Sequence, residues 1–324
     1  QESTAPGWKL SFPYVISACA VPLLFGYHIG VVNEPLETIS VDLGFHGDTM
    51  QEGLVVSTCL AGAFVGSLMS GWIADEIGRR RAFQLCALPM LIGASICATA
   101  KSLTAMLSGR FFVGIGLGIG PPVASLYITE ISPANLRGTY GSFIQIATCF
   151  GLIFALLIGI PVGRIEGWWR ICFWLSAIPA LLLIVLMQFC AESPLWLYKQ
   201  GRDAEAEAEF ERLLGLPHSR YTMAELSKSD RGDKGGAGMR TAELFYGRHS
   251  RAIFIGSTLF ALQQLSGINA VFYFSSTVFR RAGVSSSLAN VSVGIANLIG
   301  SIFAMGLIDI LGRKSLLLWS FLGM

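Results

Sequence analysis

Seven or more stretches of roughly 20 residues without a charged side chain recur along this chain of 324 residues. An α-helix of that length crosses the hydrocarbon core of a membrane. Charged residues make up only 14% of the chain, whereas a globular protein carries about 25%. The sequence therefore predicts an all-α protein that crosses a lipid bilayer many times.

The uncharged runs predict eight spans and the start of a ninth. Lysine and arginine are unequal on the two sides that these spans define, with 17 on one side and 6 on the other. The positive-inside rule then places the N-terminus and the long 192–251 segment on the cytoplasmic side or its topological equivalent. Without that segment the counts are 7 and 6, so the short loops orient the chain only weakly. The predicted spans are 11–33, 53–74, 82–100, 109–129, 139–160, 171–190, 252–278 and 287–308, with the ninth beginning at Ser315.

The positions of the cysteines indicate buried structural residues, not disulfide-bonded or metal-binding ones. All of them lie in or at the ends of apolar runs, without paired CxxC spacing, so we interpret them as small buried hydrophobic residues. The chain also has no Ser/His/Asp nucleophile set, metal-ligand spacing or phosphate loop in a soluble context. No enzyme activity, metal, cofactor or nucleic-acid partner is therefore expected. The seven are Cys19, Cys59, Cys86, Cys97, Cys149, Cys172 and Cys190.

An internal repeat relates the two parts of the chain. The loop after the second span contains Asp75, Gly78 and Arg79, and an offset of 234 residues maps it onto the loop after the eighth span. The same offset maps Gly66-Ser67 onto Gly300-Ser301. A basic cytoplasmic loop alone would explain the arginines but not the matching glycines, serines and aspartates. The repeat predicts two related bundles joined by a linker.

The fourth span, 109–129, combines glycines with a charged residue. Gly114, Gly116, Gly118 and Gly120 lack the preceding strand of a nucleotide fold and fit the small-xxx-small pattern of close helix packing. Arg110 lies at the outer end of this span, where we expect it to snorkel to the surface or to pair. The turn that follows is bracketed by Glu130 and Arg137, a natural site for an ion pair.

Amides interrupt three apolar spans. Gln263, Gln264 and Asn269 lie inside an uncharged run of 28 residues, Ala252 to Phe279. Amides donate and accept hydrogen bonds, which suits a neutral, hydroxyl-rich ligand, but buried amides also join helices. Gly267 can break the helix between them, and a site-facing Asn269 needs such local unwinding. Gln145 in the fifth span and Asn297 in the eighth extend this set.

Two further features lie outside these sets. His28 is the only ionisable group of the first span. It is either a packed histidine with a hydrogen-bond partner or a cavity-facing group that titrates near physiological pH. After the sixth span, residues 202–214 predict a short amphipathic helix with Phe210, Leu213 and Leu214 on one face, and 227–240 have the composition of a flexible linker.

The combined motifs resemble a known family of membrane transporters. They are the two related DxxGRR-type loops, GRFFVGIGLGIG with Glu130 and Arg137, ESPLWL from Glu192, and QQLSGINAVFYFSS from Gln263. Together they are similar to the sugar porter branch of the major facilitator superfamily across essentially the whole chain. FGYHIGVVN, from Phe25 to Asn33, makes the chain most similar to the plant plastidic glucose transporter group.

This resemblance implies a fold and a set of functional residues. The expected fold is an all-α membrane protein with two pseudo-symmetric six-helix bundles, here ending in span 9. The expected divisions are an N-terminal bundle at 1–191, a cytoplasmic-side linker at 192–250 and the start of the C-terminal bundle at 251–324. The implied sugar-binding residues are Gln145, Gln263, Gln264, Asn269 and Asn297. The implied gating charge network is Asp75, Arg79, Arg80, Glu130, Arg137, Glu192, Asp309 and Arg313.

The chain departs from the family pattern in three places. Glu76 replaces a usual basic residue, and the usual PESPR string becomes AESPL from Ala191 to Leu195; both changes remove parts of the charge network. His28, a candidate coupling position, stands where proton-coupled relatives carry an aspartate. A neutral histidine is less suited than a carboxylate to carrying a proton, so facilitated diffusion is favoured over proton symport.

The resemblance implies a transmembrane hexose transporter that works by alternating access. The expected partners are a monosaccharide such as glucose, the lipid bilayer, and the missing C-terminal part or a full-length relative. Proton-coupled symport and a truncated, non-transporting sugar sensor or regulatory partner are the alternatives. The implied location is the plastid inner envelope, with the Golgi, other endomembranes or the plasma membrane as alternatives.

Overall fold

The fold is known from a computed structural model. It describes residues 8–33, 35–133, 136–162, 166–215, 219, 222–224, 226–227, 250–267, 270–271, 278–279, 282–283 and 286–323. Every regular element within these ranges is a helix, which confirms the predicted all-α class. The predicted linker at 227–240 lies almost entirely outside the described residues.

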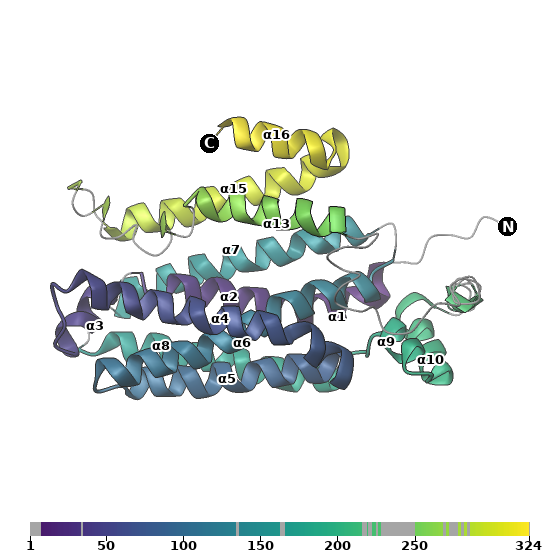
Figure 1. The fold of residues 1–324 in the computed structure, drawn as a ribbon, viewed down its shortest axis with the longest axis horizontal. Coiled ribbons are helices and arrows are strands. Elements are labelled where there is room, and N and C mark those ends of the chain that lie inside the picture. Colours follow the sequence, from purple (N-terminus) through teal and green to yellow (C-terminus); the bar gives the residue numbers. More distant parts are fainter. Residues whose placement is uncertain are drawn as a thin grey trace.

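Most of the helices run side by side along one direction (Figure 1). Short helices lie at both ends, with α3 at one and α9 and α10 at the other, and α13, α15 and α16 lie along the side formed by α7. The long helices of the first part are α1 (Trp8–Ala18), α2 (Ala20–Gly30), α4 (Thr49–Ile77), α5 (Arg79–Thr99), α6 (Leu103–Ile131), α7 (Arg137–Val162) and α8 (Trp168–Phe189). The others are α3 (Leu36–Asp42), α9 (Pro194–Lys199), α10 (Asp203–Leu214), α13 (Ser250–Leu265), α15 (Ser286–Leu311) and α16 (Arg313–Gly323).

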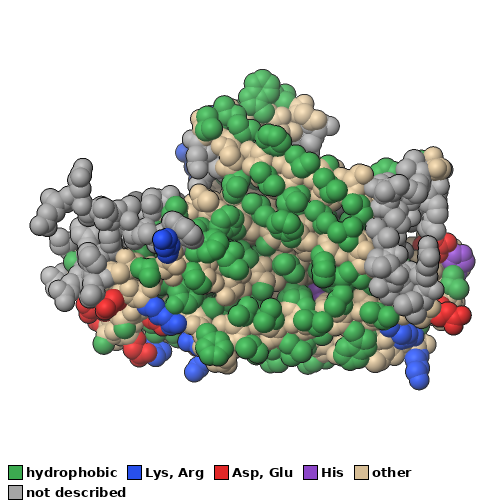
Figure 2. Space-filling view, turned by 180° about the vertical axis from the view of Figure 1, so that it is seen from behind, with side chains coloured by type: hydrophobic (Ala, Val, Ile, Leu, Met, Phe, Trp, Pro, Cys, Tyr) green, Lys and Arg blue, Asp and Glu red, His purple; other side chains and the backbone are tan. Residues whose placement is uncertain are grey.

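Within the described ranges, seven helical segments are long and apolar enough to cross a membrane. They coincide with the first six predicted spans and with the eighth. The start of the seventh predicted span is helical as α13, and its remainder lies mostly outside the described residues. On the face seen in Figure 2, hydrophobic side chains cover the middle and charged side chains gather toward the two ends, as expected of a protein whose middle lies in lipid.

Glycines set the distance between α4 and α6. A Cβ atom on Gly62 or Gly66 of α4 would strike the backbone carbonyls of α6, and one on Gly114 or Gly118 of α6 would strike those of α4. Each pair is spaced four residues apart, so it lies on one helix face. The predicted role of the glycines in close packing is confirmed, and the two backbones are in direct contact.

The turns at the two copies of the repeat correspond residue by residue. Gly78 separates α4 from α5 with φ +90°, and Gly312 separates α15 from α16 with φ +77°. L side chains rarely adopt this conformation, so glycine is favoured at both positions. The offset of 234 residues therefore holds for the helix ends as well as for the sequence letters.

The segment after α8 folds against the end of the bundle. The predicted helix at 202–214 is α10, whose apolar face buries Ala206, Phe210 and Leu213. Leu197 and Trp196 of α9 are buried as well. All seven cysteines are buried, as the sequence predicts.

Candidate functional site

Two of the predicted amides meet between α7 and α15. Gln145 of α7 and Asn297 of α15 line one cavity of about 340 Å³, together with Ser142 and Ser301. Cys149 lies beside it, because its Sγ is 3.4 Å from Ser301 Oγ and accepts a hydrogen bond from Gln145 Nε2 at 3.7 Å. The cavity therefore offers amide and hydroxyl groups from two helices that are 150 residues apart in sequence.

Gln263 lies in a different cavity. It lines a space of about 380 Å³ between α13 and α16, with Phe260, Ser320 and Phe321 among its neighbours. Gln264, the next residue on α13, is exposed and does not line either of these two cavities. Asn269 lies outside the described residues. The structure therefore places Gln145 and Asn297 in one cavity, Gln263 in another and Gln264 in neither.

The helix break predicted at Gly267 is present. Helix α13 ends at Leu265, and Gly267 has φ +77°. The Gly267 N–H donates to Gln264 O, which is the tighter turn that often closes a helix. The chain therefore leaves the helix directly after the two glutamines.

His28 is packed inside the first bundle. Its exposed fraction is 1%, and neither ring nitrogen has a hydrogen-bond partner among the described residues. Its ring meets that of Tyr27 edge to face, with centroids 5.9 Å apart. The structure therefore agrees with a packed histidine, not with a cavity-facing one, but the expected hydrogen-bond partner is absent among the described residues.

The prediction for Arg110 is wrong. This residue neither snorkels to the surface nor pairs with a described carboxylate, because it is 0% exposed inside the first bundle. Its Nε donates to Val55 O at 3.2 Å, while both Nη atoms have no acceptor among the described residues. The predicted span begins at 109, but α6 begins at Leu103, so Arg110 lies about two turns inside the helix and not at its end.

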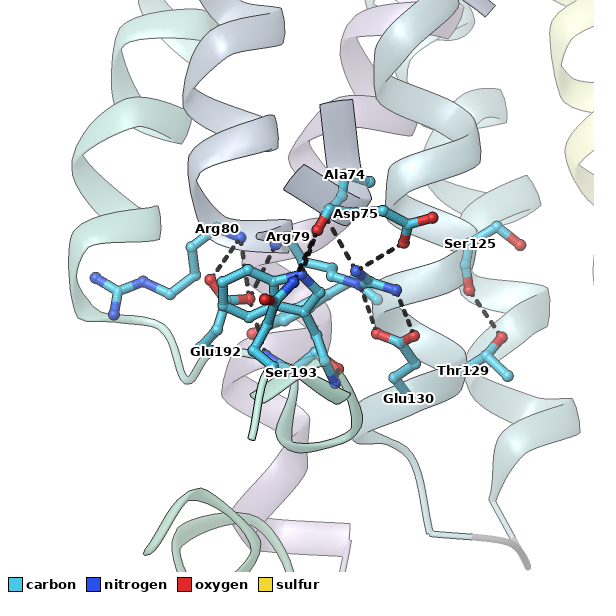
Figure 3. Close-up of polar contacts among 12 residues, drawn as sticks. Ala74, Asp75, Arg79, Arg80, Ser125, Thr129, Glu130, Glu192 and Ser193 are labelled. Carbon is cyan, nitrogen blue, oxygen red and sulfur yellow. Dashed lines mark hydrogen bonds and ion pairs between the residues drawn. The ribbon is translucent and has the colours of Figure 1, made fainter. Parts of the chain in front are cut away.

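A charge network forms at the end of the bundle where α4 meets α5 (Figure 3). Arg79 donates from Nε and Nη2 to the two carboxylate oxygens of Glu130, both at 2.9 Å. Its Nη1 also reaches Asp75 Oδ1 at 3.2 Å and Ala74 O at 3.0 Å. Arg79 is buried, so this two-point contact with Glu130 neutralises a charge that water cannot reach.

Glu192 caps the start of α5 from a distant part of the chain. Its Oε1 accepts the backbone N–H of Arg79 at 3.0 Å and that of Ser193 at 2.9 Å, and its carboxylate also accepts from Arg80 N at 3.3 Å. A carboxylate at a helix N-terminus satisfies free N–H groups and the helix dipole. Burial raises the pKa of Glu192 above its ordinary value of 4.5, and the N–H groups partly oppose this shift.

The remaining members of the predicted network have separate positions. Arg80 donates to the carbonyls of Met187 at 2.9 Å and Gln188 at 2.6 Å, at the end of α8. Arg137 begins α7 and makes no ion pair with a described residue, because Glu130 is occupied by Arg79. The side chains of Asp309 and Arg313 lie outside the described residues.

Trp196 belongs to the site, although its role was not predicted. Its indole Nε1 donates to Asp75 O at 2.8 Å, so α9 is attached to the end of α4. Ser193 Oγ accepts from Trp196 N at 3.2 Å and caps α9. Tyr127 OH donates to Ala191 O at 2.7 Å and fixes the start of the same segment. The ESPLWL string carried this information, but only the fold shows which atoms it contacts.

Comparison with known proteins gives consistent similarities. A family model described as sugar (and other) transporter matches residues 14–324. "Probable plastidic glucose transporter 2" of Arabidopsis thaliana is 66% identical over 100% of this chain and 66% of its own length. "Probable plastidic glucose transporter 3" of the same plant is 63% identical over 98% of this chain and 64% of its own. The chain thus spans about two thirds of the length of these relatives.

Among solved structures, the proton:xylose symporter XylE bound to 6-bromo-6-deoxy-D-glucose superimposes with a TM-score of 0.85 at 27% identity. The match covers 94% of this chain and 70% of that one. The inward open conformation of XylE from E. coli gives a TM-score of 0.75 at 25% identity, over 92% of this chain and 69% of that one. The described conformation is therefore more similar to the sugar-bound structure than to the inward open one.

Proposed function

Because this chain belongs to the sugar (and other) transporter family of membrane proteins, we propose that it carries a neutral monosaccharide of the glucose class by alternating access. Its relatives include proteins named as plastidic glucose transporters and as a proton:xylose symporter. Its own amides are the chemical reason for extending that substrate class to this chain. The lipid bilayer is its proposed surroundings, since seven segments have the length and apolarity of membrane spans.

The observation that carries the proposal is the cavity between α7 and α15. Gln145 lies on α7 of the first proposed bundle and Asn297 on α15 of the second, and Ser142 and Ser301 add hydroxyl groups. Amides and hydroxyls each donate and accept, as the hydroxyl groups of a sugar do. A binding site shared between two bundles can open to either side when one bundle moves against the other. We therefore propose that Gln145 and Asn297 bind the sugar, with Gln263, Gln264 and Asn269 joining them in other states of the cycle.

We propose that the charge network at the end of α4 controls the opening of that end. Arg79, Glu130 and Glu192 already join α5, α6 and the segment after α8. Asp309 and Arg313 occupy the equivalent positions of the repeat and are proposed to form the matching half, with Arg80 and Arg137 contributing. The division into bundles at 1–191 and 251–324, with the linker 192–250 between them, belongs to the same proposal.

We propose facilitated diffusion rather than proton symport. His28 lies buried without a partner, and no described carboxylate pairs with Arg110 beside it. A proton-coupled carrier needs a group that gains and loses a proton during the cycle. Proton symport is the alternative, because the solved relative XylE is described as a proton:xylose symporter. The proposed location is the plastid inner envelope, because the similar Arabidopsis proteins are named as plastidic transporters.

Uptake of radiolabelled glucose into proteoliposomes containing the purified protein tests these proposals. We expect saturable uptake that is unchanged by an imposed proton gradient. Gln145→Leu and Asn297→Leu should each reduce uptake at least tenfold, whereas Gln188→Leu, which removes an amide at the end of α8, should not. Absence of uptake for every hexose would rule out the function, and accumulation driven by the gradient would favour symport.

A further inference from the structure

A charged side chain without a counter-charge lies inside the first bundle. Arg110 is 0% exposed, and its guanidinium stays protonated in any protein environment. Val55 O accepts from Nε, but Nη1 and Nη2 have no acceptor among the described residues. No described ion pair includes Arg110. A buried, unpaired cation is among the costliest groups that a fold can contain.

His28 lies at the same level of the bundle. Leu24, Cys59 and Val113 belong to one buried cluster that joins α2, α4 and α6. His28 is one helical turn from Leu24, Val55 is one turn from Cys59, and Arg110 is one turn from Val113. Residues three or four apart share a helix face, and all three steps lead away from the charge network. His28 and Arg110 also interact electrostatically. The two polar side chains are therefore neighbours around one point between three helices.

His28 points away from α7. Gly26 and Gly30 are in close contact with α7, because a Cβ on either would strike Thr148 or Leu152. His28 is two residues from each glycine, which is about 200° around the helix. The adjacent Tyr27 hydroxyl already donates to Cys172 O at 2.6 Å. Both His28 nitrogens consequently remain without a partner among the described residues, on the face of α2 that is turned toward Arg110.

The shared chemistry of these groups indicates the class of ligand that suits them. The guanidinium offers N–H donors from two Nη atoms, and a neutral imidazole adds one more. A water molecule would satisfy some of these donors but would not balance the charge. A small anion would do both, because charge-assisted hydrogen bonds from Arg to an anion are strong. A monovalent anion suffices, since Arg110 is the single cation of the cluster.

We propose that Arg110 and His28 bind a small monovalent anion of the chloride class between α2, α4 and α6. The anion is structural: it neutralises Arg110 and holds the three helices together. This role is separate from sugar transport, and a sugar does not supply it, because a neutral monosaccharide carries no charge. Neither His28 nor Arg110 lines the cavity of Gln145 and Asn297, which lies between α7 and α15.

Thermal unfolding of the purified protein, with chloride varied against gluconate at constant ionic strength, tests the proposal. A ligand that binds only the folded state raises the unfolding midpoint in proportion to its occupancy. We expect a saturable rise on the order of 2–4 °C with chloride. Bromide should replace chloride and give one occupied position beside Arg110 by anomalous scattering. Unfolding without any chloride response, or bromide absent from this position, would overturn the proposal.

A matched pair of variants at one position sharpens the test. His28→Glu provides a carboxylate within the protein, so its unfolding midpoint should no longer respond to chloride. His28→Gln is neutral and of similar size, and it should retain a chloride response. Arg81→Gln removes an exposed arginine at the opposite end of the bundle and should leave the wild-type response unchanged. Equal responses in His28→Glu and His28→Gln would mean that chloride acts elsewhere on the surface and that the proposal is wrong.

Discussion

Arg79 and Glu130, 51 residues apart in sequence, meet in a two-point ion pair in which both N–H···O distances are 2.9 Å. The side chains are 2% and 9% exposed, so water contributes little to the solvation of either charge. Asp75 contacts the same guanidinium at 3.2 Å, but its side chain is 73% exposed. One arginine thus has a buried partner and an exposed partner.

This difference predicts unequal effects of removing the two carboxylates. Glu130→Ala leaves the buried charge of Arg79 largely uncompensated and should cost about 3–5 kcal/mol of stability. Asp75→Ala removes a solvent-screened contact and should cost less than about 1 kcal/mol. Denaturant unfolding of both variants in the same detergent measures the difference. Similar losses would show that burial does not control the strength of these contacts.

Glu192 predicts a pH effect on stability. Burial raises its pKa in the folded protein above 4.5, so the folded state binds the proton more tightly than the unfolded state does. The resulting stabilisation is fully present below pH 4.5 and is lost as the pH rises through the folded-state pKa. In this window, the unfolding midpoint of the wild-type protein should fall more steeply with rising pH than that of Glu192→Gln. Parallel pH profiles for the two proteins would contradict the assignment.

The contact between α4 and α6 predicts opposite effects of alanine at two glycines of one helix. Gly66→Ala forces a methyl group against Ile115 O and should cost about 1–3 kcal/mol. Gly71→Ala meets no atom within 4 Å, and the alanine favours the helix by up to about 1 kcal/mol. Thermal unfolding should therefore shift downward for the first variant and stay level or rise for the second. A loss at Gly71 as large as that at Gly66 would argue against close packing as the cause.

The two equivalent turns of the repeat, at Gly78 and Gly312, predict losses of stability of different size when alanine replaces the glycine. Gly78→Ala and Gly312→Ala both place a Cβ atom at positive φ, which costs on the order of 1–3 kcal/mol. Only at Gly78 would that Cβ also approach other groups, at 2.8 Å from Glu192 Oε2 and 3.1 Å from Trp196 Cη2. The unfolding midpoint should therefore fall further for Gly78→Ala. If Gly312→Ala is the more damaging variant, the contact with Glu192 is not the controlling factor.

Gln263 provides a prediction that depends on the proposed function. Gln263→Leu should abolish sugar binding and leave the free energy of unfolding within about 0.5 kcal/mol of wild type, since α13 has no buried residue in its described structure. Gln264→Leu, next to it but outside both cavities, should weaken binding less. Tryptophan fluorescence during glucose titration measures binding directly. Full binding by Gln263→Leu would move the site to the cavity of Gln145 and Asn297 alone.

The helices could be predicted from sequence because their signals are local. Uncharged runs, the glycines at the two turns and the apolar face of α10 each depend on neighbours within a few residues. Gly267 ends its helix for the same reason. The last predicted span begins at Arg313 rather than Ser315, which is the usual uncertainty at a helix end.

The pairing of side chains could not be predicted in the same way. Glu130 is close to Arg137 in sequence, yet it pairs with Arg79, because α6 packs along α4 and α5 while α7 packs along α2. The sequence places Arg110 at the start of a span with access to the surface, yet α6 begins at Leu103 and Arg110 is fully buried. Gln145 and Gln263 carry the same amide, but the path of the chain assigns them to separate cavities. These outcomes depend on which helices become neighbours.

The glycine contact between α4 and α6 has a mechanical consequence. Helices whose backbones touch have no side-chain layer that could slide or repack, so α4 and α6 must travel as one rigid body. The interface between α7 and α15 contains a cavity and a weak thiol–hydroxyl contact, so it is the interface at which the two parts can move against each other. Spin labels on α4 and α6 would keep one separation through every state of the protein, while a pair across α7 and α15 would report the motion.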